Sequence, residues 1–298
     1  MEFIVLQAAE AISKTNQKYY KLTVLTLQKE KFDLFVWNPQ LISKGFCFEV
    51  NDADIKDNGN KSTSFGNLSP VSDEVKAQLQ ALIPQPVSRE EWEALRDLIA
   101  AEIDDSPICK VFIMEMNNLY GKYKEKPAAS GVHQAYPGGL LNHVFLALKY
   151  LRAILNTSSL PLNKPVAFLA MLIHDHGKIY EYSEAEDGSI IVNPEYYLLG
   201  HMYMGASYAK KLAEAYKGCI SDKDLTYLIH CVLAHHDKLE WGSPVVPACF
   251  EAVCVHHADM LSARDDMFEW GVPGERNRYL GTAPCQYDKI PKINYEAL

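Results

Sequence analysis

Histidine and aspartate residues recur in the second half of the sequence at places where their neighbours are apolar. The run PVAFLAMLIHD at 165–175 is apolar until it ends in His174 and Asp175. An imidazole and a carboxylate at the end of a buried helix are costly unless they are paired or bind a metal. Lys178 lies three residues after Asp175, on the same face of a continuing helix. Metal binding is the chemistry this pattern suggests, and a simple helix-capping pair is the alternative.

Other segments also place imidazole or carboxylate groups on apolar faces. His143 borders the inward face of GGLLNHVFLALKYL, and alone it would be typical of a core histidine. His235 and His236 end an apolar stripe, and His201 opens a helical pattern after a glycine. Asp259 interrupts a face of small apolar residues at 248–262. A buried carboxylate favours a nearby cation, so these residues are candidates for one shared site.

The number and type of these groups predict more than one metal ion. Helical bundles commonly build metal sites from side chains on facing helices. One tetrahedral ion cannot use so many ligands, whereas two ions bridged by a carboxylate can. Imidazole with carboxylate suits Mn, Fe, Co, Ni or Zn better than Mg alone. The predicted ligands are His143, His174, Asp175, His201, His235, His236 and Asp259.

The elements that position the candidate ligands are predicted to be helices. Ser88 and Glu91 form a capping box at the start of the first one. Helical patterns follow at 110–124, 139–154, 164–178, 201–216, 222–236 and 247–265. We therefore expect a mainly α protein whose C-terminal part is a helical bundle.

The first 80 or so residues have a different pattern. Residues 20–27 and 32–37 alternate between apolar and polar types around the polar turn QKEK, which predicts a β-hairpin. A strand is expected at 45–50 and a long polar loop at 51–67. With PQPVS at 84–88 as a linker, we predict a small β-rich domain at 1–84, a helical domain at 85–275 and an irregular tail at 276–298.

Composition narrows the class of protein. The net charge of −9 excludes a chain-wide basic field for nucleic acid, so any such contact needs a local patch. The seven cysteines are scattered without a C-x-x-C pair, which argues against a disulfide framework or a thiolate zinc site. The start of the chain does not resemble a signal peptide, and no run of 18 apolar residues occurs. We expect a cytoplasmic protein with no membrane contact.

The order H…HD…H…HH…D resembles the HD superfamily of metal-dependent phosphohydrolases. Within it, five segments look like those of the YhaM-type 3′–5′ exoribonucleases. These are KPAASGVHQAYPGGLLNH (126–143), LIHDHGK (172–178), LLGH (198–201), AHHDKLEWGSPVVP (234–247) and EAVCVHHADMLSA (251–263). The resemblance covers about 85–275 and is more specific for the HD fold than for the substrate. It implies an oligonucleotide-binding (OB-like) domain before the HD domain, in keeping with the β-rich segment.

The resemblance also implies roles for the candidate ligands. One metal would be held by His143, His174, Asp175 and Asp259. Asp175 would bridge to a second metal held by His201, His235 and His236. Asp175 and Lys178 are the predicted catalytic residues, with Lys178 neutralising a phosphate oxygen or assisting the leaving group. A lysine at a helix end is otherwise simply solvated.

Substrate contacts are predicted with less support. His133, Tyr136, Trp241 and Ser243 are candidates, with packing or a structural turn as the alternative for each. Tyr19, Tyr20, Phe35 and Trp37 could stack on bases, although core packing is at least as well supported. The chain departs from the family at His176, interpreted as a passenger on the helix, where substrate contact is the alternative. It also has QKEK in place of the usual turn between the first two strands.

The function predicted from these observations is a metal-dependent phosphodiesterase. Its substrate would be single-stranded RNA, with single-stranded DNA as the alternative, digested from the 3′ end with two divalent ions. One alternative is an HD phosphohydrolase acting on nucleotides or other small phosphoesters, and another is a DNA-processing HD protein of a mobile element. A degenerate scaffold without activity is a further alternative, and self-association is left open.

Overall fold

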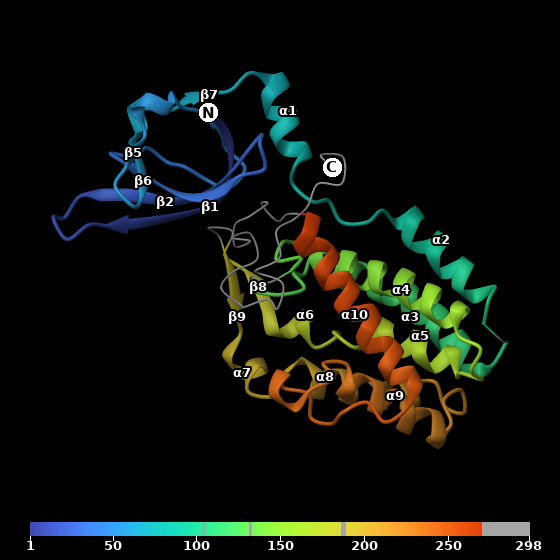
Figure 1. Cartoon of the computed structure of the whole chain (residues 1–298). Helices are drawn as coiled ribbons and strands as arrows, with labels where there is room; N and C mark the ends of the chain where they lie inside the picture. Colours follow the sequence, from blue (N-terminus) through green and yellow to red (C-terminus); the bar gives the residue numbers. More distant parts are fainter. Residues whose placement is uncertain (104, 131–132, 186–188, 270–298) are drawn as a thin grey trace. The chain divides into compact units, whose positions relative to one another are not determined.

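A computed structural model of the chain describes residues 1–103, 105–130, 133–185 and 189–269 (Figure 1). Two compact units are built mainly on residues 1–85 and on residues 86–183 with 190–269, and each is described by itself. The irregular segment expected from 271 and the predicted tail at 276–298 lie outside the described residues.

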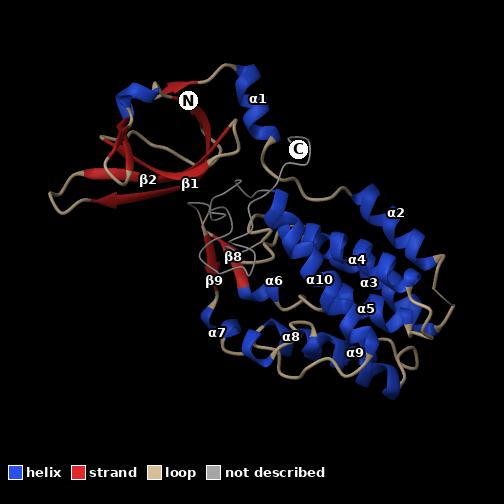
Figure 2. Ribbon diagram, in the orientation of Figure 1, coloured by secondary structure: helices blue, strands red, loops and turns tan. Residues whose placement is uncertain are grey.

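The N-terminal unit is a curled sheet of seven strands in the order β5-β6-β3-β2-β1-β4-β7 (Figure 2). The pairing is antiparallel except between β3 and β6. The sheet encloses an apolar core, and its curled form fits the predicted OB-like domain. The elements are β1 (Glu2–Ile12), β2 (Lys18–Thr26), β3 (Lys31–Trp37), β4 (Cys47–Glu49), β5 (Lys56–Asp57), β6 (Lys61–Ser64), β7 (Ser69–Pro70) and helix α1 (Asp73–Ala81).

The predicted hairpin is confirmed as β2 and β3, in which Leu22 faces Leu34. The prediction that QKEK joins the first two strands is wrong, because β1 precedes the hairpin and residues 13–17 form that turn. The sequence hides β1 because Phe3, Ile4 and Val5 are all buried, so the strand lacks a period of two. Ile4 packs with Leu79 of α1 in a second apolar cluster that also contains Leu25.

The stretch at 51–67 is not the predicted loop. It contains β5 and β6, and β6 pairs with β3 through backbone hydrogen bonds that polar side chains do not reveal. The aromatic residues of the hairpin divide between the two faces of the sheet. Tyr20 belongs to the core, whereas Tyr19 lies with its ring centroid 5.0 Å from Trp37 and 5.8 Å from Phe35 on the opposite face.

The second unit is the predicted helical bundle. Its apolar helix α5 is buried from Pro165 to Ile173 and contacts α3, α4, α9 and α10 (Figure 1). The Ser88–Glu91 capping box is present at the start of α2. The elements are α2 (Arg89–Ala100), α3 (Pro107–Tyr123), α4 (Gly139–Thr157), α5 (Lys164–Ile173), α6 (Lys178–Glu181), β8 (Tyr182–Glu184), β9 (Ile190–Val192), α7 (Pro194–Tyr197), α8 (His201–Ala215), α9 (Asp222–Ala234) and α10 (Phe250–Glu269).

The helix predicted at 164–178 is in fact interrupted. Helix α5 ends at Ile173, residues 174–177 form a turn, and α6 begins at Lys178. In the turn, the amide of His176 donates to Ile173 O and the amide of Lys178 donates to Asp175 O, both at 3.0 Å. These i to i+3 bonds tighten the backbone, so His174 and Asp175 leave the helix axis together.

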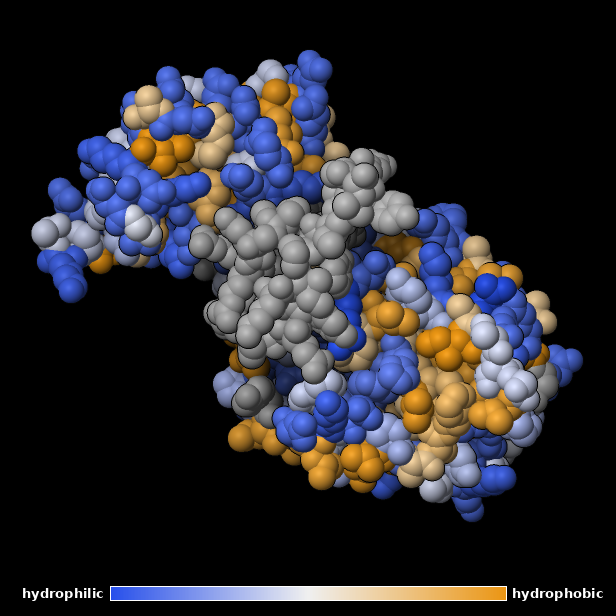
Figure 3. Space-filling view, in the orientation of Figure 1, coloured by the Kyte–Doolittle hydropathy of each residue, from blue (hydrophilic) through white to orange (hydrophobic). Residues whose placement is uncertain are grey.

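The surface of the described part of the chain carries both polar and apolar regions. Figure 3 shows hydrophilic side chains over most of the visible face of the N-terminal unit and several hydrophobic patches on the helical unit. Exposed apolar side chains near the start of α8 include Leu198, Leu199 and Tyr203. None of the helices described is long and apolar enough to cross a membrane.

Candidate metal centre

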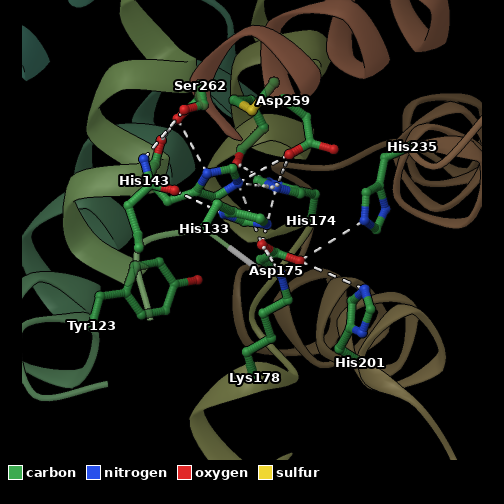
Figure 4. Close-up of polar contacts among 12 residues, drawn as sticks. Tyr123, His133, His143, His174, Asp175, Lys178, His201, His235, Asp259 and Ser262 are labelled. Carbon is green, nitrogen blue, oxygen red and sulfur yellow. Dashed lines mark hydrogen bonds and ion pairs between the residues drawn. The ribbon is translucent and has the colours of Figure 1, made fainter. Parts of the chain in front are cut away.

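Four predicted ligands meet at one end of the apolar core (Figure 4). His143 comes from α4, His174 and Asp175 from the turn after α5, and Asp259 from α10. His143 Nε2 lies 2.9 Å from Asp259 Oδ1 and 3.4 Å from Asp175 Oδ2. His174 Nε2 lies 3.4 Å from Asp175 Oδ2 and 3.5 Å from Asp259 Oδ1. The four side chains therefore direct nitrogen and oxygen atoms at one small volume.

Three further histidines gather around the other oxygen of Asp175. Nε2 of His201 lies 3.6 Å from Asp175 Oδ1, and Nε2 of His235 lies 3.8 Å from it. His236 completes this group, because its ligand atom and those of His201 and His235 all lie within 4.8 Å of one another. The two oxygens of one carboxylate thus face two groups of imidazoles, and these groups adjoin, since ligand atoms of His174, His235 and Asp259 also lie within 4.8 Å of one another.

The second group has the character of a metal site rather than of a hydrogen-bonded core. Asp175 Oδ1, His201 Nε2 and His235 Nε2 are buried and have no hydrogen-bond partner within the described residues. A buried polar atom without a partner is unfavourable by about 1–3 kcal/mol. A divalent cation would satisfy all three atoms, since neutral imidazole nitrogen and carboxylate oxygen are its common ligands. The donor set therefore fits divalent metal binding, with Asp175 between the two groups of imidazoles.

The orientation of each imidazole supports this use of its Nε2 atom. The Nδ1 atom of every predicted histidine ligand lies near an oxygen that can accept its proton. For His143, His174, His235 and His236 that oxygen accepts a hydrogen bond, which fixes the tautomer and leaves Nε2 free for a ligand. Glu181 Oε2 lies close to His201 Nδ1 without a hydrogen bond within the described residues. The pairs are His143 with Ser262 Oγ at 3.1 Å, His174 with Met171 O at 2.7 Å, His201 with Glu181 Oε2 at 3.3 Å, His235 with Val232 O at 2.7 Å and His236 with Trp241 O at 3.0 Å.

Two of these outer partners, Ser262 and Glu181, were not predicted. Ser262 follows Asp259 by three residues on the face predicted at 248–262, but the sequence did not indicate a bond from Ser262 to His143. Its hydroxyl donates to His143 O at 2.9 Å and accepts from His143 Nδ1. Glu181 is buried at the end of α6, and no sequence signal connects it with His201. The turn at 174–177 brings the two together.

Burial and nearby charges together set the pKa values of the site. Burial disfavours the charged form of His174, but Asp175 and Asp259 outweigh that effect and raise its pKa to about 10. Burial lowers the pKa of His235, and nearby His236 lowers it further. Burial would raise the pKa of Asp175, yet Lys178 and His174 hold it well below the usual range. The site therefore attracts positive charge beside its carboxylates, which a metal could supply in place of a proton.

Lys178 is buried and its ammonium donates to Asp175 Oδ2 at 2.7 Å. It begins α6 rather than continuing α5, so its place beside Asp175 follows from the turn and not from a continuous helical face. The lysine shares its partner oxygen with the His143 and His174 group. It thus brings a positive charge to the edge of the first metal position.

Two glycines allow the backbone segments of the site to approach one another. A Cβ atom at Gly177 would lie 2.4 Å from the Cα of His201 and 2.6 Å from its carbonyl oxygen. A Cβ atom at Gly205 of α8 would lie 2.9 Å from a methyl of Val232 and 3.1 Å from Ile173 O. The turn at 174–177 and α8 therefore pack with almost no space between their backbones, and α9 packs on α8 through the Val232 side chain.

His176 is buried, which differs from the predicted passenger on a helix. Its ring stacks on Tyr208 with centroids 3.7 Å apart, and its Nδ1 lies 3.3 Å from the Tyr123 hydroxyl. Tyr208 donates in turn to Glu115, whose carboxylate is also bonded by Tyr216 at 2.9 Å. Ring stacking on Tyr208 and hydrogen bonds through partly buried Tyr208 and Tyr216 to Glu115 thus anchor the turn that carries Asp175.

The four residues predicted to contact substrate have different surroundings in the structure. The His133 ring lies 5.0 Å from that of His143, beside the first metal position (Figure 4). Tyr136 is buried and accepts a hydrogen bond from Asn142. Trp241 is exposed, with Lys238 Nζ 4.4 Å from its ring centroid. The buried Ser243 hydroxyl lies 2.9 Å from Leu233 O and 2.8 Å from Val245 O, a geometry that favours a structural turn.

Comparison with known families agrees with this geometry. Residues 140–264 match the family model described as HD domain, so this part of the chain is an HD domain. Such domains are metal-dependent, and the clustered histidines and aspartates lie within or next to the matched segment.

Two curated relatives carry the same name, 3′-5′ exoribonuclease YhaM. The protein from Geobacillus sp. (strain WCH70) is 35% identical over 165 residues, which are 53% of this chain and 49% of that protein. The protein from Bacillus subtilis (strain 168) is 27% identical over 222 residues, which are 73% of this chain and 69% of that protein. The alignment thus spans about half the length of the first relative. No solved structure matches the chain.

Proposed function

We propose that the protein is a metal-dependent 3′–5′ exonuclease acting on single-stranded RNA in preference to DNA. The observation that carries the proposal is the division of the Asp175 carboxylate between two groups of imidazoles. A shared carboxylate between two ligand groups suits the pair of ions used in phosphodiester hydrolysis. The names of the two relatives support the choice of an RNA substrate and of the 3′ end.

The chain's own residues would divide the work of hydrolysis. His143, His174, Asp175 and Asp259 would hold one ion, and Asp175 with His201, His235 and His236 the other. Bound divalent ions would supply Lewis acidity for attack of water on phosphorus. Mn, Fe, Co or Ni suits the imidazole-rich ligand set better than Mg alone. The buried ammonium of Lys178 would neutralise charge on a phosphate oxygen or on the leaving group.

The N-terminal unit is proposed to bind the RNA strand. Tyr19, Phe35 and Trp37 share one face of the β2–β3 hairpin, with Lys21 following Tyr19 on that face. Aromatic side chains beside a cation suit single strands, because any base can stack on them. We also propose a domain division at residues 84 and 85 and a cytoplasmic location.

The test is digestion of a 5′-labelled single-stranded RNA and of the DNA of the same sequence by protein loaded with Mn²⁺. We expect products that shorten step by step from the 3′ end, and more slowly for DNA. The Asp175→Asn variant should abolish the ladder, because it removes the charge shared by both ligand groups. Glu214→Gln, an exposed carboxylate on α8, is the matched control and should leave digestion unchanged.

A different set of products would refute the proposal. Cleavage inside a circular RNA would indicate an endonuclease. Failure of metal-loaded protein to shorten either strand, with hydrolysis of small phosphoesters instead, would favour the nucleotide-hydrolase alternative.

A further inference from the structure

His133 has one ring nitrogen that is engaged and one that is not. Its Nδ1 lies 2.7 Å from Oε1 of the neighbouring Gln134. Its Nε2 makes no hydrogen bond within the described residues, although the ring lies beside His143 at the metal centre. Which nitrogen carries the proton decides whether the free atom is a donor or an acceptor.

Gln134 settles the position of the proton. Its amide nitrogen Nε2 donates to Ser262 O at 3.2 Å, and a carbonyl oxygen can only accept. The side-chain amide of Gln134 is therefore oriented with Oε1 toward His133, and this oxygen can only accept a hydrogen bond. His133 Nδ1 must then donate, and the neutral imidazole presents Nε2 as a bare acceptor.

The loop that carries His133 is held in a strained shape to keep this arrangement. Gln134 has a φ of 37°, in a region that residues with a side chain rarely adopt. Its backbone amide donates to Asp266 Oδ2 of α10 at 2.7 Å. A Cβ atom at Gly139 would lie 1.9 Å from Gln134 O, so only glycine permits this approach. Strain of this kind is commonly kept at functional sites.

We propose that His133 Nε2 accepts a hydrogen bond from a ribose hydroxyl of the nucleotide whose phosphate lies at the metal centre. The inference rests on the proposed function and makes His133 a specificity-determining residue. Phosphate oxygens cannot satisfy a bare acceptor, because they are acceptors themselves at neutral pH. The hydrogen-bond donors nearest to a nucleotide's phosphate are the 2′ and 3′ hydroxyls of its sugar. A donor attached to the 3′-terminal sugar would also mark the end of the strand.

The experiment compares three RNAs that differ only in their last sugar, which is ribose, 2′-deoxyribose or 3′-deoxyribose. Each is digested by the full chain loaded with Mn²⁺ and by the variants His133→Phe and His133→Asn. Removal of the first nucleotide gives kcat/KM for each pair of enzyme and substrate. Metal content and melting temperature are measured on the same samples, so that loss of a fold or an ion is visible.

We expect the unmodified chain to lose roughly tenfold in kcat/KM on one of the two deoxy substrates, the typical effect of one hydrogen bond. The analogue that is affected identifies the hydroxyl. His133→Phe should be slower on ribose by a similar factor and should not distinguish that analogue from ribose. His133→Asn, which can present an oxygen at this position, should restore part of the discrimination.

Equal discrimination by the unmodified chain and His133→Phe would overturn the inference and leave the exonuclease proposal intact. Loss of a metal ion in His133→Phe would also overturn it, because His133 would then be a ligand. If the unmodified chain shortens none of the three RNAs, the proposed function fails and the inference fails with it.

Discussion

Replacement of Gly177 by alanine tests whether the turn at 174–177 places His201 by direct backbone contact. Gly177 has φ −60° and ψ −25°, which any residue adopts without strain. Alanine in such a conformation normally stabilises a protein by about 0.4–1 kcal/mol relative to glycine. Backbone conformation alone therefore predicts a more stable protein.

Contacts across the turn predict instead that the substitution makes the protein less stable. The added Cβ would lie 2.4 Å from His201 Cα, whereas ordinary contact begins at 3.4 Å, so α8 must move by about 1.0 Å. Overpacking of this kind typically costs about 1–3 kcal/mol. The same shift would move His201 relative to Asp175 Oδ1, and a displacement of about 1 Å in a catalytic group can cost on the order of 100-fold in rate.

Two measurements are made on separate samples. Urea unfolding of the metal-free protein gives its stability, and RNA digestion with Mn²⁺ gives its activity. Gly121→Ala on α3 is the matched control, because a Cβ atom there meets nothing within 4 Å. We expect Gly177→Ala to be less stable and less active than the unmodified chain, and Gly121→Ala to be slightly more stable with full activity.

Stabilisation by both substitutions would refute the reasoning, because it would mean that Gly177 and α8 are not in contact. Loss of stability at Gly177 with unchanged activity would show that the contact exists but does not position His201.

Two further predictions concern other groups of the helical unit. Glu181→Gln should weaken metal binding about 10–100-fold in calorimetric titration, because it removes the charge beside His201 Nδ1, and unchanged affinity would contradict that role. The thiol of Cys231 lowers the pKa of half-buried Cys249 to about 7, whereas burial raises that of Cys254 to about 11. The thiolate of Cys249 therefore forms at lower pH than that of Cys254. Alkylation of Cys249 by iodoacetamide should accelerate between about pH 6 and pH 8. Mass spectrometry of the peptides would detect this, and faster labelling of Cys254 would be inconsistent with it.

The candidate metal ligands could be identified in the sequence because several of them break a strong local pattern. His174 and Asp175 end an apolar run, and Asp259 interrupts a face of small residues. The curled sheet was predicted less completely. Strand β1 is buried on both faces where α1 covers it, and β6 is polar although its backbone pairs with β3.

The outer partners of the site were beyond prediction because they depend on contacts between distant segments. Glu181 reaches His201 only because the helix breaks after Ile173, and the sequence there suggests a continuous helix. The tautomer of His133 depends on Ser262, 128 residues from Gln134 along the chain. Periodicity describes one element at a time and carries no information on such pairs.

The spacing of three residues on helix α10 limits how the length of this helix can change. Asp259, Ser262 and Asp266 follow one another at intervals of three and four residues, and they serve the metal centre, the orientation of His143 and the anchoring of the Gln134 loop. A deletion of one residue between Asp259 and Asp266 would rotate everything after it by about 100°. Substitutions on α10 are therefore tolerated far more readily than changes in its length. One continuous helix fixes the spacing between the candidate metal centre and the loop that carries His133 and Gln134.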